Sequence, residues 1–322
     1  MPASSAPTRI RPAERPPGHG RGRLAPPGRL PADALLLATV LLWSFNFTAI
    51  RYAVSHGFAP LTFAPVRWAI AAAAFSAVTW RREGSLRVSR RDLALLAVLA
   101  SIGLWVNQVA LTYAVRLTTA STVALLFGTL PVFVGLFSHA ARVERLRARH
   151  WAATAVSFTG VALVALGGGG KLSAHVGGVL LALVTAASFA AYSVGVVPLM
   201  QRYSPYRISA VTALVGAALL GGTGSWQLAK QDWHVGALAW GALLYGALVA
   251  VGLGNLLWFK AIDRVVPGRA AIYLNLQPFL GAVLALAVLS ESLGALQVVG
   301  GIVVGTGIVL ARVRATPAPP AE

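Results

Sequence analysis

Long apolar runs, separated by short polar and charged clusters, set the pattern of this chain. A helix needs about 20 apolar residues to cross a bilayer, and runs of that size occur ten times. A glycine-rich break at 167–170 divides them into two groups of five. We therefore expect ten membrane-spanning helices, near residues 34–54, 61–80, 93–114, 119–138, 150–167, 176–199, 206–224, 237–260, 269–289 and 294–312.

Composition supports a membrane protein and marks the ends of the chain. Hydrophobic residues make up 57% of the chain and charged residues 11%, whereas soluble domains carry about 25% charged residues. Residues 1–32 hold eight prolines and six arginines, a composition that cannot bury a core. We expect a disordered basic cytoplasmic tail at 1–32, five-helix units at 33–167 and 176–314, a glycine-rich external linker at 168–175 and a second disordered tail at 315–322.

The distribution of basic residues predicts the orientation in the membrane. The formal charge of +18 would suggest a nucleic-acid partner, but the basic residues lie in the clusters between the spans. With the N-terminus inside, cytoplasmic segments hold 22 lysines and arginines and external segments hold four, in agreement with the positive-inside rule. We expect a multi-pass protein of a bacterial-type inner membrane, with both termini cytoplasmic. Its surroundings are the lipid bilayer and not nucleic acid.

The two groups of five spans are copies of one unit. A shift of 147 residues places Pro131 on Pro278 and Glu144 on Glu291. Because five is odd, the second copy enters the membrane upside down relative to the first. Inverted repeats are the architecture of alternating-access transporters, with the binding site near the membrane midplane. The sequence thus predicts an all-α polytopic fold of two inverted five-helix repeats.

Glu144 and Glu291 each lie in the short turn before the last helix of their repeat. Glu291 is the one formal charge between Arg269 and Arg312, so a catalytic acid or a proton carrier has to be weighed. The inversion puts the two carboxylates on opposite faces, where they cannot form one site. We interpret both as turn markers, carboxylates favoured by the free N–H groups and the dipole of a helix N-terminus.

The pattern P-x12-E-x-L occurs twice, starting at Pro131 and at Pro278. Four longer stretches, two of which contain this pattern, carry a resemblance to a known family. These are "LLWSFNFTAIRYAV", "FAPLTFAPVRWAI", "TYAVRLTTASTVALLFGTLPVFVGLFSHAARVERL" and "LLWFKAIDRVVPGRAAIYLNLQPFLGAVLALAVLSESL". Together they resemble the EamA-type, ten-helix branch of the drug/metabolite transporter superfamily, over about residues 34–312. The resemblance implies a carrier of small metabolites, often an amino-acid exporter, with a central cavity lined largely by helices 1, 3, 4, 6, 8 and 9. It does not supply the substrate.

Several polar and aromatic residues fall inside the predicted spans, where a buried amide or hydroxyl is costly unless it is bonded. Each marks either a bond between helices or a wet cavity, and the pattern leaves both alternatives open. On the first predicted helix, Trp43, Asn46 and Phe47 share one face because of their spacing. Gln108 and Asn255 correspond to each other under the repeat. The candidates for lining a substrate cavity are Trp43, Asn46, Phe47, Gln108, Ser188, Tyr192, Asn255, Tyr273 and Gln277.

Arg67 lies inside the second predicted span, roughly 9 Å from its outer end at 1.5 Å per residue. It can snorkel toward the external headgroups, act as a gate or anchor a substrate carboxylate. From the sequence we favour a structural or gating role. Pro131 and Pro278 predict paired kinks that shape the cavity. Gly301 and Gly305 form a GxxxG pattern, which indicates helix packing or a homodimer face.

The distribution of chemically reactive residues favours transport over catalysis. All nine acidic residues and all six histidines lie in tails, loops or helix ends, and the chain has no cysteine. No metal site, catalytic triad or carboxylate pair is therefore expected at membrane depth. We expect no enzyme activity and no cofactor, but a secondary carrier that exports a small neutral, zwitterionic or anionic metabolite such as an amino acid. A membrane-embedded lipid-modifying enzyme or a lipid flippase is the alternative.

Overall fold

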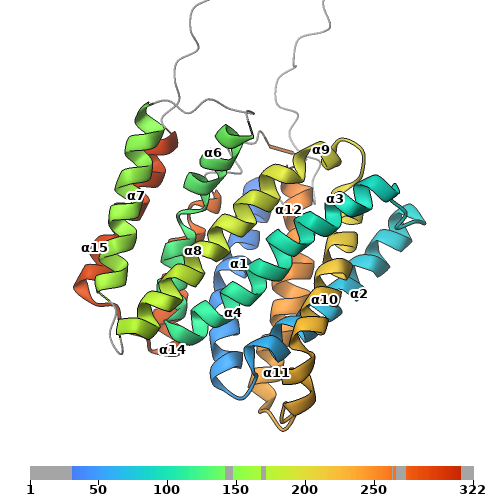
Figure 1. Ribbon diagram of the computed structural model, residues 1–322, viewed down its shortest axis with the longest axis horizontal. Helices are drawn as coiled ribbons and strands as arrows, with labels where there is room; N and C mark the ends of the chain where they lie inside the picture. The colour runs from blue at the N-terminus through green and yellow to red at the C-terminus, as the bar shows by residue number, and fades with distance from the viewer. Residues whose placement is uncertain (1–30, 142–147, 168–171, 263, 266–272, 313–322) are drawn as a thin grey trace, which may run out of the picture. The chain divides into compact units, whose positions relative to one another are not determined.

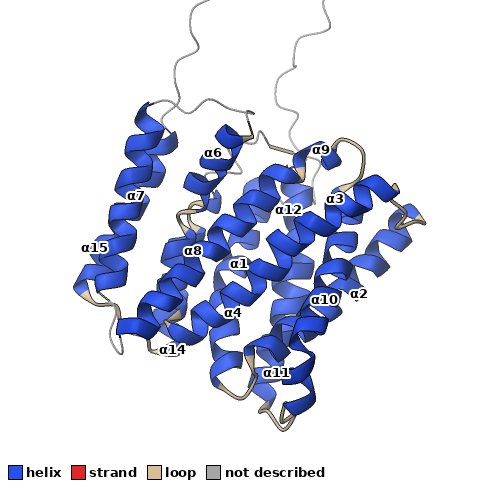
Figure 2. Ribbon diagram, viewed as in Figure 1, coloured by secondary structure: helices blue, strands red, loops and turns tan. Residues whose placement is uncertain are grey.

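The computed structural model describes residues 31–141, 148–167, 172–262, 264–265 and 273–312. These residues form helices joined by short turns, with no strand among them (Figure 2). In this part of the chain, seven helical stretches are long and apolar enough to cross a membrane: Ala32–Ser55, Pro60–Glu83, Arg90–Leu117, Ala120–Ala140, His175–Gly195, Pro205–Lys230 and Ala237–Ile262. The protein is all-α and passes through the membrane several times.

The helices begin and end close to the predicted spans. In the first half they are α1 (Ala32–Ser55), α2 (Pro60–Glu83), α3 (Arg90–Ala100), η1 (Ser101–Val106), α4 (Asn107–Leu117), α5 (Ala120–Phe127), α6 (Leu130–Ala140) and α7 (Ala148–Leu166). In the second half they are α8 (Leu172–Gly195), α9 (Val197–Met200), α10 (Pro205–Lys230), α11 (Ala237–Leu244), η2 (Tyr245–Leu253), α12 (Gly254–Ile262), α14 (Gln277–Leu289) and α15 (Ala295–Arg312).

Seven of the ten predicted spans coincide with a helical stretch that has the length and composition of a span. The other three correspond to α7 and to the shorter apolar helices α14 and α15. Residues 269–272 of the ninth predicted span lie outside the described residues.

The two prolines of the repeat interrupt their helices at matching places. Pro131 is the second residue of α6 and Pro278 the second residue of α14, and a turn precedes each helix. Proline lacks the N–H that would continue the preceding helix and fits the first turn of a new one. The helical structure is therefore interrupted directly before each proline, where the sequence predicts a kink.

Helices of the two halves pack against each other in a regular exchange. Within the compact unit that starts at Ala32, α7 packs along α15 and α2 along α10, so these helices lie beside their own counterparts (Figure 1). Several other contacts occur in matched pairs. The contact of α1 with α14 corresponds to that of α8 with α6, and the contact of α4 with α8 to that of α1 with α12.

Small residues allow α7 and α15 to approach backbone to backbone. A Cβ on Gly160 would lie 2.7 Å from the carbonyl oxygen of Gly300, and a Cβ on Gly300 would lie 2.7 Å from that of Gly160. A Cβ on Gly301 would lie 3.1 Å from Leu125, and one on Gly305 2.8 Å from Phe279. The face on which the sequence suggests a homodimer is thus packed against side chains of the same chain.

Candidate functional site

Arg67 lies in α2 with 1% of its surface exposed, and it is the largest fully buried side chain of the described residues. Snorkelling to the headgroups would leave the guanidinium exposed, so the structure excludes that interpretation. The sequence places no residue of opposite charge near it in α2. An unpaired charge inside a membrane is expensive and commonly functional.

Neutral amides surround this cation. Arg67 donates from Nη1 to Oδ1 of Asn46 at 3.2 Å and from Nη2 to Oε1 of Gln108. Gln108 donates from Nε2 to Oδ1 of Asn107 at 2.6 Å, and Asn107 donates to the carbonyl oxygen of Thr185 at 2.8 Å. This chain of bonds, the arginine–amide network, joins α1, α2 and α4 of the first repeat to α8 of the second.

The network is closed in by apolar surface. The guanidinium carbon of Arg67 lies 5.4 Å from the ring centre of Phe63 and 5.8 Å from that of Trp68, a favourable arrangement for a cation and an aromatic face. From the second repeat, Gly246 approaches so closely that a Cβ there would lie 2.9 Å from Cδ of Arg67 and 3.3 Å from Oδ1 of Asn46. Both repeats therefore form the walls of the site.

The electrostatic balance of Arg67 is incomplete. None of the ion pairs seen among the described residues includes Arg67. Its Nε is buried and has no hydrogen-bond partner within the same part of the chain. Amide dipoles offset a charge only partly where the dielectric constant is low, and a buried donor without an acceptor adds a further penalty. The site thus holds one uncompensated positive charge and one free donor.

Two π-helical segments flank the network. The first, η1, ends directly before Asn107 and Gln108, and the second, η2, contains Gly246. The repeat shift of 147 residues carries 101–106 onto 248–253, so the two segments are equivalent. π-helical turns are rare and occur often at functional sites. Their occurrence at equivalent places beside one buried charge marks this region as the candidate site.

The predicted aromatic face of α1 meets η2. Trp43 donates from Nε1 to the carbonyl oxygen of Ala250 at 3.0 Å, and Tyr245 donates to the carbonyl oxygen of Leu42 at 2.9 Å. Phe47 turns instead into the main apolar cluster, where it is 4% exposed. Of the three residues predicted to share a face, Asn46 belongs to the network and Trp43 borders it, while Phe47 packs in the core.

The remaining candidates are spread over the helical unit. Ser188 bonds the carbonyl oxygen of Thr185, to which Asn107 also donates. Tyr192 packs on Gly103 of η1. Asn255 of α12, the counterpart of Gln108, donates to the carbonyl oxygen of Val251 in the adjoining η2 and is not part of the network. Two candidates near the start of α14 pack with α1: Tyr273 lies beside Leu35 and Leu36, and the carbonyl oxygen of Gln277 accepts from Ser44.

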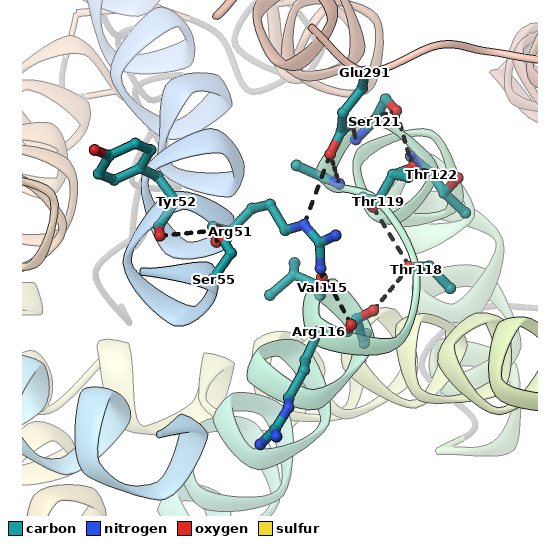
Figure 3. A network of polar contacts seen from close by, with 12 residues as sticks. Arg51, Tyr52, Ser55, Val115, Arg116, Thr118, Thr119, Ser121, Thr122 and Glu291 are labelled. Carbon is teal, nitrogen blue, oxygen red and sulfur yellow. Dashed lines mark hydrogen bonds and ion pairs between the residues drawn. The ribbon is translucent and has the colours of Figure 1, made fainter. Parts of the chain in front are cut away.

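Glu291 caps a helix from the other half of the chain. Its carboxylate accepts from the backbone N–H of Ala120 at 2.9 Å, from that of Ser121 at 3.0 Å and from the Ser121 hydroxyl at 2.7 Å, at the start of α5 (Figure 3). Arg51 lies between Glu291 and the end of α4, with Nε 4.0 Å from the carboxylate. The repeat counterpart, Glu144, lies outside the described residues.

Sequence reasoning missed Asn107, Thr185 and Gly246 as parts of the site. Asn107 is adjacent to a candidate, but its spacing gave no reason to prefer it. Thr185 contributes a main-chain oxygen, which no side-chain pattern reveals, and Gly246 contributes only its lack of a side chain. An arginine inside a predicted span, with no acidic residue near it in the same helix, was the available signal.

Comparisons with known proteins agree with this architecture. The EamA-like transporter family matches residues 30–166 and again residues 176–313. A probable terminal-alkyne amino-acid exporter of Streptantibioticus cattleyicolor is 28% identical over 87% of this chain and 92% of its own length. A probable biotin transporter of Pseudomonas aeruginosa is 29% identical over 80% of this chain and 88% of its own.

A solved crystal structure shares the fold, with a TM-score of 0.60 and 22% identity over 87% of this chain and 96% of that one. The family match covers both halves of the chain separately, and its two parts are displaced by nearly the same interval as the internal repeat. The chain belongs to the EamA-like transporter family.

Proposed function

We propose that this protein is a secondary transporter that exports a small neutral, zwitterionic or anionic metabolite, such as an amino acid. The observation that carries the proposal is the arginine–amide network, a polar site with one uncompensated positive charge between the two repeats. Binding sites of repeat-based transporters lie at such an interface. Membership of a transporter family supports transport rather than catalysis.

In this proposal the chain has ten membrane-spanning helices, in inverted repeats at about 33–167 and 176–314. The exchange of helix contacts supports a two-fold relation between the halves, because a contact between two helices recurs between their counterparts with the roles reversed. An odd number of spans in each repeat makes this two-fold relation an inversion.

Alternating access then consists of rocking one group of helices against the other. The α2–α10 pair is tied at both ends. At one end Gln231 and Gln227 accept from the N–H groups of Ala59 and Leu61. At the other, Arg207 forms an ion pair with Glu83 at 2.9 Å. We expect α2 and α10 to move as one body, which carries Arg67 with it.

The names of the relatives support a small solute with a carboxylate group. One is named as an amino-acid exporter and another as a biotin transporter, and both kinds of solute carry a carboxylate. In this proposal the residues closest to the solute are Trp43, Asn46, Gln108, Ser188 and Tyr192, which lie in or near the network.

In this proposal the protein lies in the inner membrane with both termini in the cytoplasm, and the excess of basic residues in the predicted cytoplasmic segments supports this orientation. Reporter fusions at the C-terminus and at Lys171 test this orientation. A C-terminal reporter active on the outside overturns the proposed number of spans or the orientation.

Proteoliposomes that contain the purified protein, loaded with pooled metabolites, test the function. The expected result is the protein-dependent release of one or a few small solutes that carry no net positive charge. Chemical turnover of a lipid headgroup without movement of solute would favour a membrane enzyme, and movement of lipid between leaflets alone would favour a flippase. Either result overturns the proposal.

A further inference from the structure

The free donor of Arg67 shows where an anion fits. On a guanidinium, Nε–H and one Nη–H point the same way and form a fork that matches the two oxygens of a carboxylate. In Arg67 the Nε has no partner, and the neighbouring Nη2 is bonded to the single amide oxygen of Gln108. One amide oxygen cannot fill both positions of the fork.

We infer that Arg67 binds the carboxylate of the transported solute, which displaces the amide of Gln108 and occupies Nε and Nη2 together. This inference rests on the proposed transport function and specifies its substrate class. Asn46 stays on Nη1 and holds the guanidinium in place. Burial of 99% of the arginine removes water as a competing acceptor, and a charge-assisted pair is much stronger in such a site than in water.

The structure also links the release of Gln108 to both repeats. Gln108 is bonded to Asn107, Asn107 is bonded to the main chain of α8, and both amides follow directly after η1. A solute that takes the place of the Gln108 oxygen therefore breaks the link through which Arg67 of α2 is joined to α8. This loosening is the kind of differential contact that a ligand needs in order to shift a conformational equilibrium.

A purely structural arginine makes a different prediction. If the amides were the intended partners, an acid supplied by the protein in place of Gln108 would strengthen the same contact and leave the response to solutes unchanged. If the fork receives a solute carboxylate, that acid occupies the fork permanently and excludes the solute. Gln108→Glu therefore separates the two roles.

The experiment measures the melting temperature of the purified full-length protein in detergent. The probe is sodium propionate, compared with propionamide, which has the same shape but no charge, and with sodium chloride at equal ionic strength. For the wild type we expect a saturable rise of about 2 °C at ten times the dissociation constant of propionate, and none with the two comparison solutes. A response to propionate no larger than the response to sodium chloride overturns the inference.

Two variants and a control complete the test. Gln108→Glu is expected to melt at a higher temperature without propionate and to lose the propionate response. Gln201→Glu, the same change at an exposed turn, is expected to keep it. Arg67→Gln is also expected to lose the propionate response, and it replaces Gln108→Glu in the test if that variant does not fold. A wild-type response in either Gln108→Glu or Arg67→Gln overturns the inference.

The outcomes also distinguish the carboxylate assignment from the proposed transport function and from the binding of another anion. Because melting is measured without transport, a propionate response together with vesicles that release no solute would defeat the transport proposal alone. Solute release without a propionate response would defeat only the carboxylate assignment. A response to sodium phosphate and none to propionate would replace the carboxylate with a phosphate group and overturn the inference as stated.

Discussion

Two arginines, Arg51 at the end of α1 and Arg67 inside α2, show two ways in which this fold accommodates a positive charge. The side chain of Arg51 is 28% exposed, lies 4.0 Å from Glu291 and donates to main-chain oxygens at the end of α4 (Figure 3). Arg67 is 1% exposed and bonds only to neutral amides among the described residues. Arg67, the more deeply buried of the two charges, is therefore the one without an acidic partner among the described residues.

The difference has a physical meaning. Arg51 has a structural role, because it lies where the C-terminus of α4 meets the N-terminus of α5 that Glu291 caps. Its remaining donors can bind water. Arg67 has neither water nor an acid, and its Nε stays unbonded within the described part of the chain. A buried ionisable group without a compensating charge is a candidate functional group, which is the basis of the carboxylate proposal.

The largest expected effect follows from Arg67→Lys. Lysine keeps the charge but has no planar fork, so it cannot hold Asn46 and a carboxylate in fixed directions at once. We expect transport per folded molecule to fall about 100-fold, since loss of one good charge-assisted contact is worth about 1.5–3 kcal/mol. The measurement is initial efflux from proteoliposomes, normalised to folded protein. Arg51→Lys is the matched control, and equal transport in both variants would contradict the comparison.

Glu291→Gln should affect folding more than transport. Glu291 accepts three hydrogen bonds at the start of α5, and a glutamine would present an NH₂ group to donors that need an acceptor. An unsatisfied buried donor costs about 1–3 kcal/mol. We therefore expect a lower melting temperature and a lower yield, with transport per folded molecule within about two-fold of the wild type. Normal yield with abolished transport would show that Glu291 takes part in transport.

The role of Glu291 shows how far the sequence reaches. A carboxylate beside a helix N-terminus was predictable from its turn and from its repeat counterpart, but the helix that it caps begins 171 residues earlier in the chain. Local rules identify the preference of a carboxylate for a helix start. Only tertiary packing selects which helix start it reaches, so the partner was not predictable from one sequence.

The all-helical fold and the position of most helices followed from apolar runs, because the thickness of the bilayer fixes the length of a span. The site was harder to predict. Asn46, Gln108 and Arg67 were all candidates, yet their spacing within separate helices contains no information on their mutual distance. The two π-helical segments left no recognisable signature in the residues of η1 and η2.

Gly246→Ala should disturb the Arg67 site by a smaller amount. The added methyl group would lie 2.9 Å from Cδ of Arg67 and 3.3 Å from Oδ1 of Asn46, so the bond between these two side chains has to shift. Because a displaced contact loses only part of its strength, we expect about a ten-fold loss of transport, equivalent to about 1.4 kcal/mol. Gly241→Ala, where the methyl group meets nothing within 4 Å, is the matched control and should transport normally. Full activity of Gly246→Ala would show that Arg67 can be displaced without consequence.

The smallest effect is expected for Arg51→Ala. Its loss removes one bond to the carbonyl oxygen of Arg116 at 3.1 Å, one to that of Val115 and the pairing with Glu291 at 4.0 Å. Carbonyl groups at a helix end can bind water instead, and Glu291 keeps its three donors from α5. A partly exposed ion pair and a helix-dipole contact each contribute about 0.3–1 kcal/mol, so we expect a fall in melting temperature of only a few degrees and transport close to that of the wild type.

The salt dependence of melting provides a control. Since salt screens exposed charges over about 3 Å at 1 M, the difference in melting temperature between Arg51→Ala and the wild type should shrink in 1 M sodium chloride. A loss of transport as large as that of Arg67→Lys would show that Arg51 also takes part in transport, and the distinction between the two arginines would fail.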